Sequence, residues 1–261
     1  MTAPLAPPAP AADTGAASVK LGKLPVRHDV RTLRLQRYTD PAKLPEPPEQ
    51  LDLAAPVPGW PMYANDRLGD CTCAAAGHMI EAWSAAAGAL VEVTERAVVD
   101  AFDHVKIVDT ATGEAGAVEL DVLTYWRKTG IGGHRIGAFA AVAVHDGRLV
   151  RTAGWLFGGL YIGLALPLTA QRQAVWDWTG SLSGPARPGS WGGHAVDVVG
   201  YSAAGLDVVT WGEVKTMTWA FWERYTDEAY AIISPDFLRG DRAPNGFDLA
   251  ALRADLALVT A

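Results

Sequence analysis

The chain has 261 residues, of which 49% are hydrophobic and 20% are charged, and its formal net charge is −7. This length and apolar content suffice for a buried core, so we expect a globular protein. The acidic balance, with no run of lysine or arginine, argues against a nucleic-acid partner, because neutralising phosphates requires a basic surface.

The N-terminal region is predicted to lack regular structure. Residues 1–19 are mostly alanine, proline and threonine, which favours a disordered arm. They have neither the basic start nor the apolar run of a secretion signal, so we expect a cytoplasmic or virion-associated location. Residues 20–58 are punctuated by prolines, which exclude a long helix and favour an extended strap over the surface. Residues 20–261 as a whole are expected to form a single domain.

Helices are predicted for the first half of this domain, residues 59–133. Asp70 can cap an apolar, alanine-rich stretch that begins at Cys71 and is expected to form a buried helix. Two further amphipathic helices are predicted over Thr94–Val105 and Glu119–Lys128.

Strands are predicted for the second half, residues 134–235, and a tail with a short helix at Leu249–Leu258 for 236–261. Glycines and Pro167 interrupt the apolar stretch after Ala153, so it predicts a buried strand rather than a membrane span. A helical segment is expected over Thr218–Tyr225. The predicted strands are Ile136–Val144, Trp155–Leu166, His194–Tyr201, Leu206–Trp211 and Ala229–Ile233.

A cysteine and a histidine stand out as a candidate catalytic pair. A thiol is nucleophilic as the thiolate, which a helix N-terminus and a neighbouring imidazolium both stabilise. Cys71 begins a predicted helix and His194 lies on a predicted strand. Cys73 lies roughly 200° around the helix from Cys71 and is expected in the core. A disulfide between these two cysteines is not expected, which fits a reducing compartment.

The other titratable side chains are interpreted as structural. His78 is expected to point to a different sector of the helix from Cys71. Asp197 is expected to be a turn-capping or surface carboxylate, because it should face away from His194. The remaining histidines follow no ligand spacing, so neither a metal nor a cofactor is expected.

Several short segments of the chain resemble the papain-like cysteine peptidases, in particular their shorter bacterial branch. They are Leu68-Gly-Asp-Cys-Thr72, His194-Ala-Val196, Val199-Gly-Tyr201 and Trp211-Gly212, in the family's order and with a fitting Cys-to-His interval. The resemblance implies an α+β, papain-like fold, in which a helical half with a central nucleophile helix packs on an antiparallel β half. The excess of arginine over lysine also hints at a GC-rich bacterial or phage genome.

The resemblance also implies roles for residues around the pair. Asn65 stands where the family has a glutamine that helps to hold the oxyanion. Val209 stands in the register of the asparagine that orients the imidazole, and Thr210 is the nearest group able to accept a ring N–H hydrogen bond. Asp70, beside Cys71, should raise the pKa of the thiol.

Two functions follow as hypotheses. The first is a cysteine peptidase that hydrolyses peptide bonds in peptide or protein substrates through Cys71 and His194. The second is a catalytically inactive papain-like binding or structural protein, for example one associated with a phage. A cell-wall amidase-type thiol fold fits less well, because its Cys-to-His interval is usually much shorter. Neither a nucleic acid nor a membrane is an expected partner, and no sequence feature points to an oligomeric state.

Overall fold

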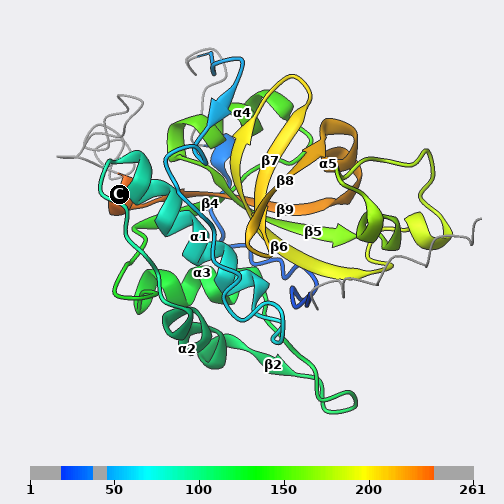
Figure 1. The fold of residues 1–261 in the computed structure, drawn as a ribbon, viewed down its shortest axis with the longest axis horizontal. Coiled ribbons are helices and arrows are strands. Elements are labelled where there is room, and N and C mark those ends of the chain that lie inside the picture. Colours follow the sequence, from blue (N-terminus) through cyan, green and yellow to red (C-terminus); the bar gives the residue numbers. More distant parts are fainter. Residues whose placement is uncertain (1–18, 38–45, 238–261) are drawn as a thin grey trace, which may run out of the picture.

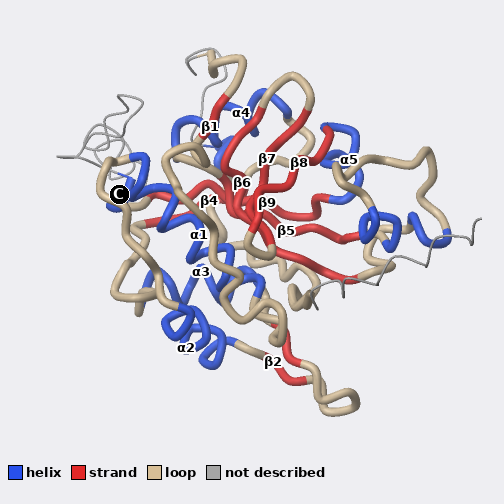
Figure 2. The backbone as a smooth tube through the Cα atoms, viewed as in Figure 1, coloured by secondary structure: helices blue, strands red, loops and turns tan. Residues whose placement is uncertain are grey.

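The structure, a computed structural model, describes residues 19–37 and 46–237. The predicted arm, apart from Val19, and the helix predicted at Leu249–Leu258 lie outside these residues. Helices α1 to α3 gather on one side of an antiparallel sheet (Figures 1 and 2). Helices α4 and α5 belong to the apolar cluster on the opposite side. Among the described residues, no helix combines the length and apolar character that crossing a bilayer requires.

The three helices predicted for the first half are confirmed. They are α1 (Cys71–Ala86), α2 (Glu95–Val105) and α3 (Glu119–Lys128). Helix α1 is largely apolar and is buried along nearly its whole length, because it lies between the sheet and the other two helices (Figure 1). Thr94 caps α2 by accepting a hydrogen bond from the backbone N–H of Ala97. The first half also contains a hairpin of β2 (Ile107–Val108) and β3 (Ala115–Gly116).

The β half is one seven-stranded sheet in the order β4-β9-β5-β6-β7-β8, with β1 paired to β6. All of its strand pairs are antiparallel. The helix predicted near Thr218–Tyr225 is confirmed as α5 (Trp219–Tyr225). The strands are β1 (Leu51–Asp52), β4 (Ala138–Ala141), β5 (Leu160–Leu166), β6 (Gly192–Tyr201), β7 (Gly205–Thr210), β8 (Glu213–Thr218) and β9 (Thr226–Ile233).

The strand predicted to start at Trp155 is wrong at its beginning. Residues Gly147–Phe157 form α4, and only Leu160–Leu166 form the strand. The Asp146 side chain caps this helix by accepting a hydrogen bond from the N–H of Leu149, and Gly158 ends it with a φ of 71°. The cap and the terminating glycine decide for a helix where apolar content alone was ambiguous.

The surface position expected for Asp197 is also wrong. Asp197 lies on the central strand β6 between β5 and β7, and only 1% of it is exposed. Neither carboxylate oxygen accepts a hydrogen bond from the described residues. Burial therefore raises the pKa of Asp197 well above its ordinary value.

Replacing Asp197 by asparagine is expected to stabilise the protein at alkaline pH. Because the folded-state pKa is raised, the carboxyl costs nothing below its unfolded pKa, and its penalty grows as the pH rises above that value. Asp197→Asn should raise the free energy of unfolding by about 3 kcal/mol near pH 8 and change it little near pH 4. Urea denaturation at both pH values measures this, and an equal effect at the two would contradict the assignment.

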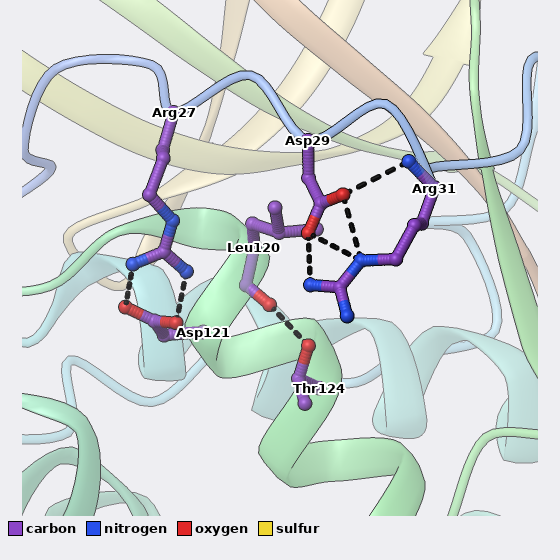
Figure 3. Close-up of polar contacts among 6 residues, drawn as sticks. All are labelled: Arg27, Asp29, Arg31, Leu120, Asp121 and Thr124. Carbon is purple, nitrogen blue, oxygen red and sulfur yellow. Dashed lines mark hydrogen bonds and ion pairs between the residues drawn. The ribbon is translucent and has the colours of Figure 1, made fainter.

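The predicted strap follows an irregular path and is tied to the helical half. The guanidinium of Arg27 makes a bidentate ion pair with the carboxylate of Asp121 on α3 (Figure 3). Two residues further on, Asp29 accepts hydrogen bonds from the backbone N–H of Arg31 at 2.9 Å and from its side chain. The first contact ties the strap to α3, and the second stabilises a local turn of the strap.

Candidate active site

Helix α1 and strand β6 bring the predicted thiol and imidazole to one place. Cys71 is the first residue of α1, His194 is the third residue of β6, and the two elements pack against each other. Both residues line a small cavity, together with Asn65, Thr210 and Trp211. All four residues singled out for the site therefore meet at this cavity.

The imidazole of His194 is held on one edge and on one face. Its Nε2 lies 2.7 Å from Oγ1 of Thr210, and its ring stacks on that of Trp211 with centroids 4.5 Å apart. The other ring nitrogen, Nδ1, has no hydrogen-bond partner among the described residues. Burial lowers the pKa of His194 to about 3, so the ring is neutral in this arrangement.

The turn after Thr210 leads into β8, a strand that was not predicted from the sequence. Trp211 and Gly212 have φ angles of 48° and 80°, which make a two-residue turn between β7 and β8. Strand β8 was not predicted, because its residues Glu213–Thr218 are largely polar. The same turn presents the ring of Trp211 to His194.

Removing the hydroxyl of Thr210 is expected to destabilise the protein. Thr210→Val leaves the buried Nε2 of His194 without a partner, which should lower the free energy of unfolding by about 1–3 kcal/mol. Thr210→Ser keeps the hydroxyl and serves as the matched control, with less than half of that loss. Urea denaturation of both variants checks the prediction, and equal losses would mean that packing rather than the hydrogen bond matters.

Asn65 is fixed beside the cavity by a tight turn. Its backbone N–H bonds to the carbonyl of Met62 at 3.3 Å, and its Nδ2 donates to the carbonyl of Leu68 at 3.1 Å. The amide also lies against the carboxyl of Asp70, and Asn65 lines the cavity. The turn thus brings Asn65 to the wall of the cavity, although its side chain is shorter than that of the glutamine found in the papain-like family.

Asp70 does not cap α1 in the way the sequence predicted. Its side chain makes no capping hydrogen bond; the first turn is closed by its backbone carbonyl, which accepts from the N–H groups of Cys73 and Ala74. The side chain is buried, and burial raises the pKa of Asp70 to about 7. The side-chain amide of Asn65 lies close enough to offset this rise in part.

The two cysteines are both buried free thiols. Burial, with a smaller contribution from the neighbouring Asp70, raises the pKa of Cys71 to about 12, although the N–H groups of Ala195 and Gly22 oppose the rise. Cys73 packs in the apolar cluster and does not line the cavity. The structure therefore places Cys73 in the core, and Cys71 at the site as a protonated thiol.

His78 lies on the same helical face as Cys71, contrary to prediction. Seven residues are nearly two full turns, so the two side chains align, and His78 lines the same cavity. Its ring lies against Trp60 and Tyr63, with centroids 5.7 and 4.9 Å away, and its Nε2 lies 2.8 Å from the carbonyl of Pro61. Burial lowers the pKa of His78 to about 4. The i, i+7 spacing was the signal that could have revealed this position.

The strap passes over the site, which the sequence did not reveal. The N–H of Lys20 bonds to the carbonyl of Asn65 at 2.8 Å, and the carbonyl of Lys20 accepts from Nε1 of Trp211 at 3.3 Å. The N–H of Lys23 bonds to the carbonyl of Gly193 at 3.1 Å. These contacts hold the strap against the site, where Cys71 is buried, and we call this placement of the strap the closed arrangement.

Helices packed on one side of an antiparallel sheet, with a cysteine at the start of the central helix and a histidine on the facing strand, define a papain-like fold. This confirms the α+β architecture. The described residues contain no group of three His, Cys, Asp or Glu side chains placed to hold a metal ion.

Solved structures of cysteine proteases share this fold. Xylellain, a cysteine protease from Xylella fastidiosa, is 15% identical, with a TM-score of 0.62 over 85% of this chain and 97% of that one. Procathepsin B S9 from Trypanosoma congolense is 14% identical, with a TM-score of 0.56 over 82% and 86% of the two chains. Procathepsin L 3 from the Tenebrio molitor larval midgut is 15% identical, with a TM-score of 0.56 over 83% and 77%. No protein-family model and no curated protein matches the sequence.

Proposed function

We propose that the protein is a papain-like cysteine peptidase that cleaves peptide bonds in peptide or protein substrates. The observation that carries the proposal is the meeting of Cys71 and His194 at one cavity, with the imidazole held by Thr210. The fold shared with solved cysteine proteases supports it. The proposal extends to a bacterial or phage origin and to a cytoplasmic or virion-associated location.

The chemistry follows from the placement of these groups. The imidazole of His194 takes the thiol proton of Cys71 as the sulfur attacks the acyl carbon, and then gives that proton to the leaving amine. Water hydrolyses the resulting thioester and restores the thiol. The side-chain amide of Asn65 and the backbone N–H of Cys71 donate to the oxyanion, and such a donor typically contributes a factor of about 10²–10³ to turnover. The sequence of steps needs no metal or cofactor.

Thr210 has the role of a positioning residue in this proposal. Its hydroxyl accepts a hydrogen bond from the protonated Nε2 of His194, which leaves the other ring nitrogen free to receive the proton of the thiol. An asparagine amide would accept the same bond, so the hydroxyl substitutes for it at the next position along β7. Trp211 covers this contact and shields it from water.

A catalytically inactive binding or structural protein is the second candidate, and one observation favours it. The pKa of Cys71 is raised to about 12 and that of His194 is lowered to about 3, so the pair is neutral in the closed arrangement. In a peptidase the strap must move aside before a substrate can reach the thiol. An inactive relative needs no such step.

The test is cleavage of a mixed peptide library, with new termini identified by mass spectrometry. We use the full chain as wild type and as Lys23→Met. This change removes the ion pairs that Lys23 of the strap makes with Asp227 and Glu228, and so favours opening. Cleavage that is lost in Cys71→Ala and His194→Ala but kept in Cys73→Ala supports the peptidase. Cleavage that survives Cys71→Ala, or no cleavage by either form, overturns it, and the second outcome supports the inactive alternative.

A further inference from the structure

Beside the cavity, the strap inserts a lysine into a pocket of three carboxylates. We infer that the pocket formed by Glu119, Asp227 and Glu228 is a subsite for a lysine or arginine side chain of a peptide ligand, and that Lys23 occupies it in the closed arrangement. The inference names the ligand class of the proposed peptidase site, and it rests on that proposal for the substrate role alone.

The contacts of Lys23 define what the pocket binds. The side chain is 1% exposed, and its Nζ lies 3.0 Å from Oδ2 of Asp227 and 3.0 Å from Oε1 of Glu228. Burial alone would lower the pKa of Lys23, but the carboxylates of the pocket outweigh this effect and raise it. A buried ammonium is tolerated only where such partners compensate the lost hydration. The pocket is therefore built for a cation.

The acceptors of the pocket exceed what one lysine uses. Glu119 is fully buried, and neither of its carboxylate oxygens accepts a hydrogen bond from the described residues. Glu228 additionally accepts a hydrogen bond at 2.7 Å from the hydroxyl of Tyr230 through its second oxygen. Burial and the neighbouring Glu228 raise the pKa of Glu119 well above its ordinary value, although Lys23 opposes the rise. Three acidic side chains facing one ammonium leave acceptor capacity, which a guanidinium with its five N–H donors can fill. Both basic side chains thus match the pocket.

A glycine on β5 provides the room for the basic side chain. A Cβ atom at Gly163 would lie 2.0 Å from Cε of Lys23 and 2.8 Å from Oε1 of Glu119. Any side chain at this position would fill the pocket. The space occupied by Lys23 therefore exists because residue 163 has no side chain.

The pocket adjoins the candidate nucleophile, and the backbone groups around it can bind an extended chain. The backbone of Ala117 donates to the carbonyl of Gly22 at 2.8 Å and accepts from the N–H of Leu24 at 2.9 Å. On the other side, the carbonyl of Gly193 accepts from the N–H of Lys23. Gly22, the residue before Lys23, brings its N–H to the thiol of Cys71. A peptide that replaced residues 22–24 would meet the same groups and set its basic side chain next to the cleavage site.

The experiment separates binding from catalysis. The ligands are fluorescent hexapeptides of one constant sequence. In each peptide one position is replaced by Lys, Arg, norleucine or Glu, and the set covers every position in turn. Their binding to the full chain with Lys23→Met and Cys71→Ala is measured by fluorescence anisotropy. Lys23→Met keeps the approximate length of the side chain but removes its charge. The ion pairs that hold residue 23 in the pocket are then lost, which leaves the pocket accessible to a peptide. We expect the Lys and Arg peptides to bind at least tenfold more tightly than the norleucine and Glu peptides at one register.

The carboxylates supply the matched variants. Adding Glu119→Gln should reduce the preference for Lys and Arg severalfold, whereas adding Glu114→Gln, at an exposed position near the β2–β3 hairpin, should leave it unchanged. If Lys23→Met does not fold, Lys23→Gln carries the test, because its amide can still donate hydrogen bonds to the carboxylates but has no charge to keep it in the pocket. In that variant the basic peptides should still bind best, with a smaller margin.

Each outcome bears on one proposal at a time. Selective binding of basic peptides without cleavage in the Cys71-containing protein supports the subsite and rejects the peptidase. Cleavage without a basic preference supports the peptidase and overturns the subsite. Equal binding of all four peptide types, or a preference that Glu119→Gln leaves unchanged, overturns the subsite whether or not cleavage occurs.

Discussion

Cys71 in the folded chain is expected to react with iodoacetamide about 10³-fold more slowly than in the unfolded chain near pH 7.5. The thiolate is the reactive form, and a free thiol has a pKa of about 8.5, whereas burial raises the pKa of Cys71 to about 12. The ratio of thiolate fractions at this pH sets the size of the effect. Short pulses of reagent on folded and urea-unfolded protein, followed by mass spectrometry, measure both rates.

The pH dependence gives the same prediction a second readout. With a pKa near 12, the labelling rate of folded Cys71 should rise about tenfold per pH unit up to about pH 9 without a plateau. Cys73→Ala is the control that isolates Cys71, since Cys73 lies in the core. A plateau below pH 8 would instead reveal a preformed thiolate and imidazolium, and would contradict the closed arrangement.

Reversing the charge of Lys23 is expected to release the strap and to speed the alkylation of Cys71 by about 10²-fold. Lys23→Glu places a fourth carboxylate among Glu119, Asp227 and Glu228, and like charges in a buried site cannot all ionise. The side chain is expected to leave the pocket and to take the neighbouring Gly22 with it, which exposes the thiol to water and relieves the burial that raises the pKa of Cys71. The same pulse labelling near pH 7.5 measures the change.

Lys20→Glu is the matched control for this prediction. It makes the same charge reversal on the same strap, but the side chain of Lys20 is exposed and only its backbone contacts the site. We expect its labelling rate to stay within about twofold of wild type. If both variants labelled equally fast, net charge rather than the anchored lysine would control access, and the closed arrangement would need another explanation.

Local signals predicted the helices and the candidate pair. Two of these signals mark the start of a helix to within a few residues. They are Thr94 with the amphipathic stretch after it, and Asp70 with the apolar stretch that begins at Cys71. The resemblance around Cys71 and His194 located the two sides of the cavity, and the position after Val209 located the hydroxyl that binds the imidazole. These features depend on neighbours in the sequence.

Features set by distant contacts were missed. The path of residues 20–24 depends on hydrogen bonds to Asn65, Ala117 and Gly193, none of which leaves a pattern in the strap itself. The burial of Asp197 follows from its place on a central strand, because both faces of the sheet are covered. Periodicity gives the face of a strand, but it does not say whether that face is covered.

Burial of the thiol is also expected to slow the oxidation of Cys71. Hydrogen peroxide oxidises cysteine through its thiolate, so a buried thiol with a pKa near 12 is a poor target for conversion to sulfenic acid. We therefore expect Cys71 to stay reduced in peroxide for as long as the strap remains in this arrangement. Sensitivity to peroxide should appear only when the strap lifts, which makes irreversible damage a hazard of the open protein alone.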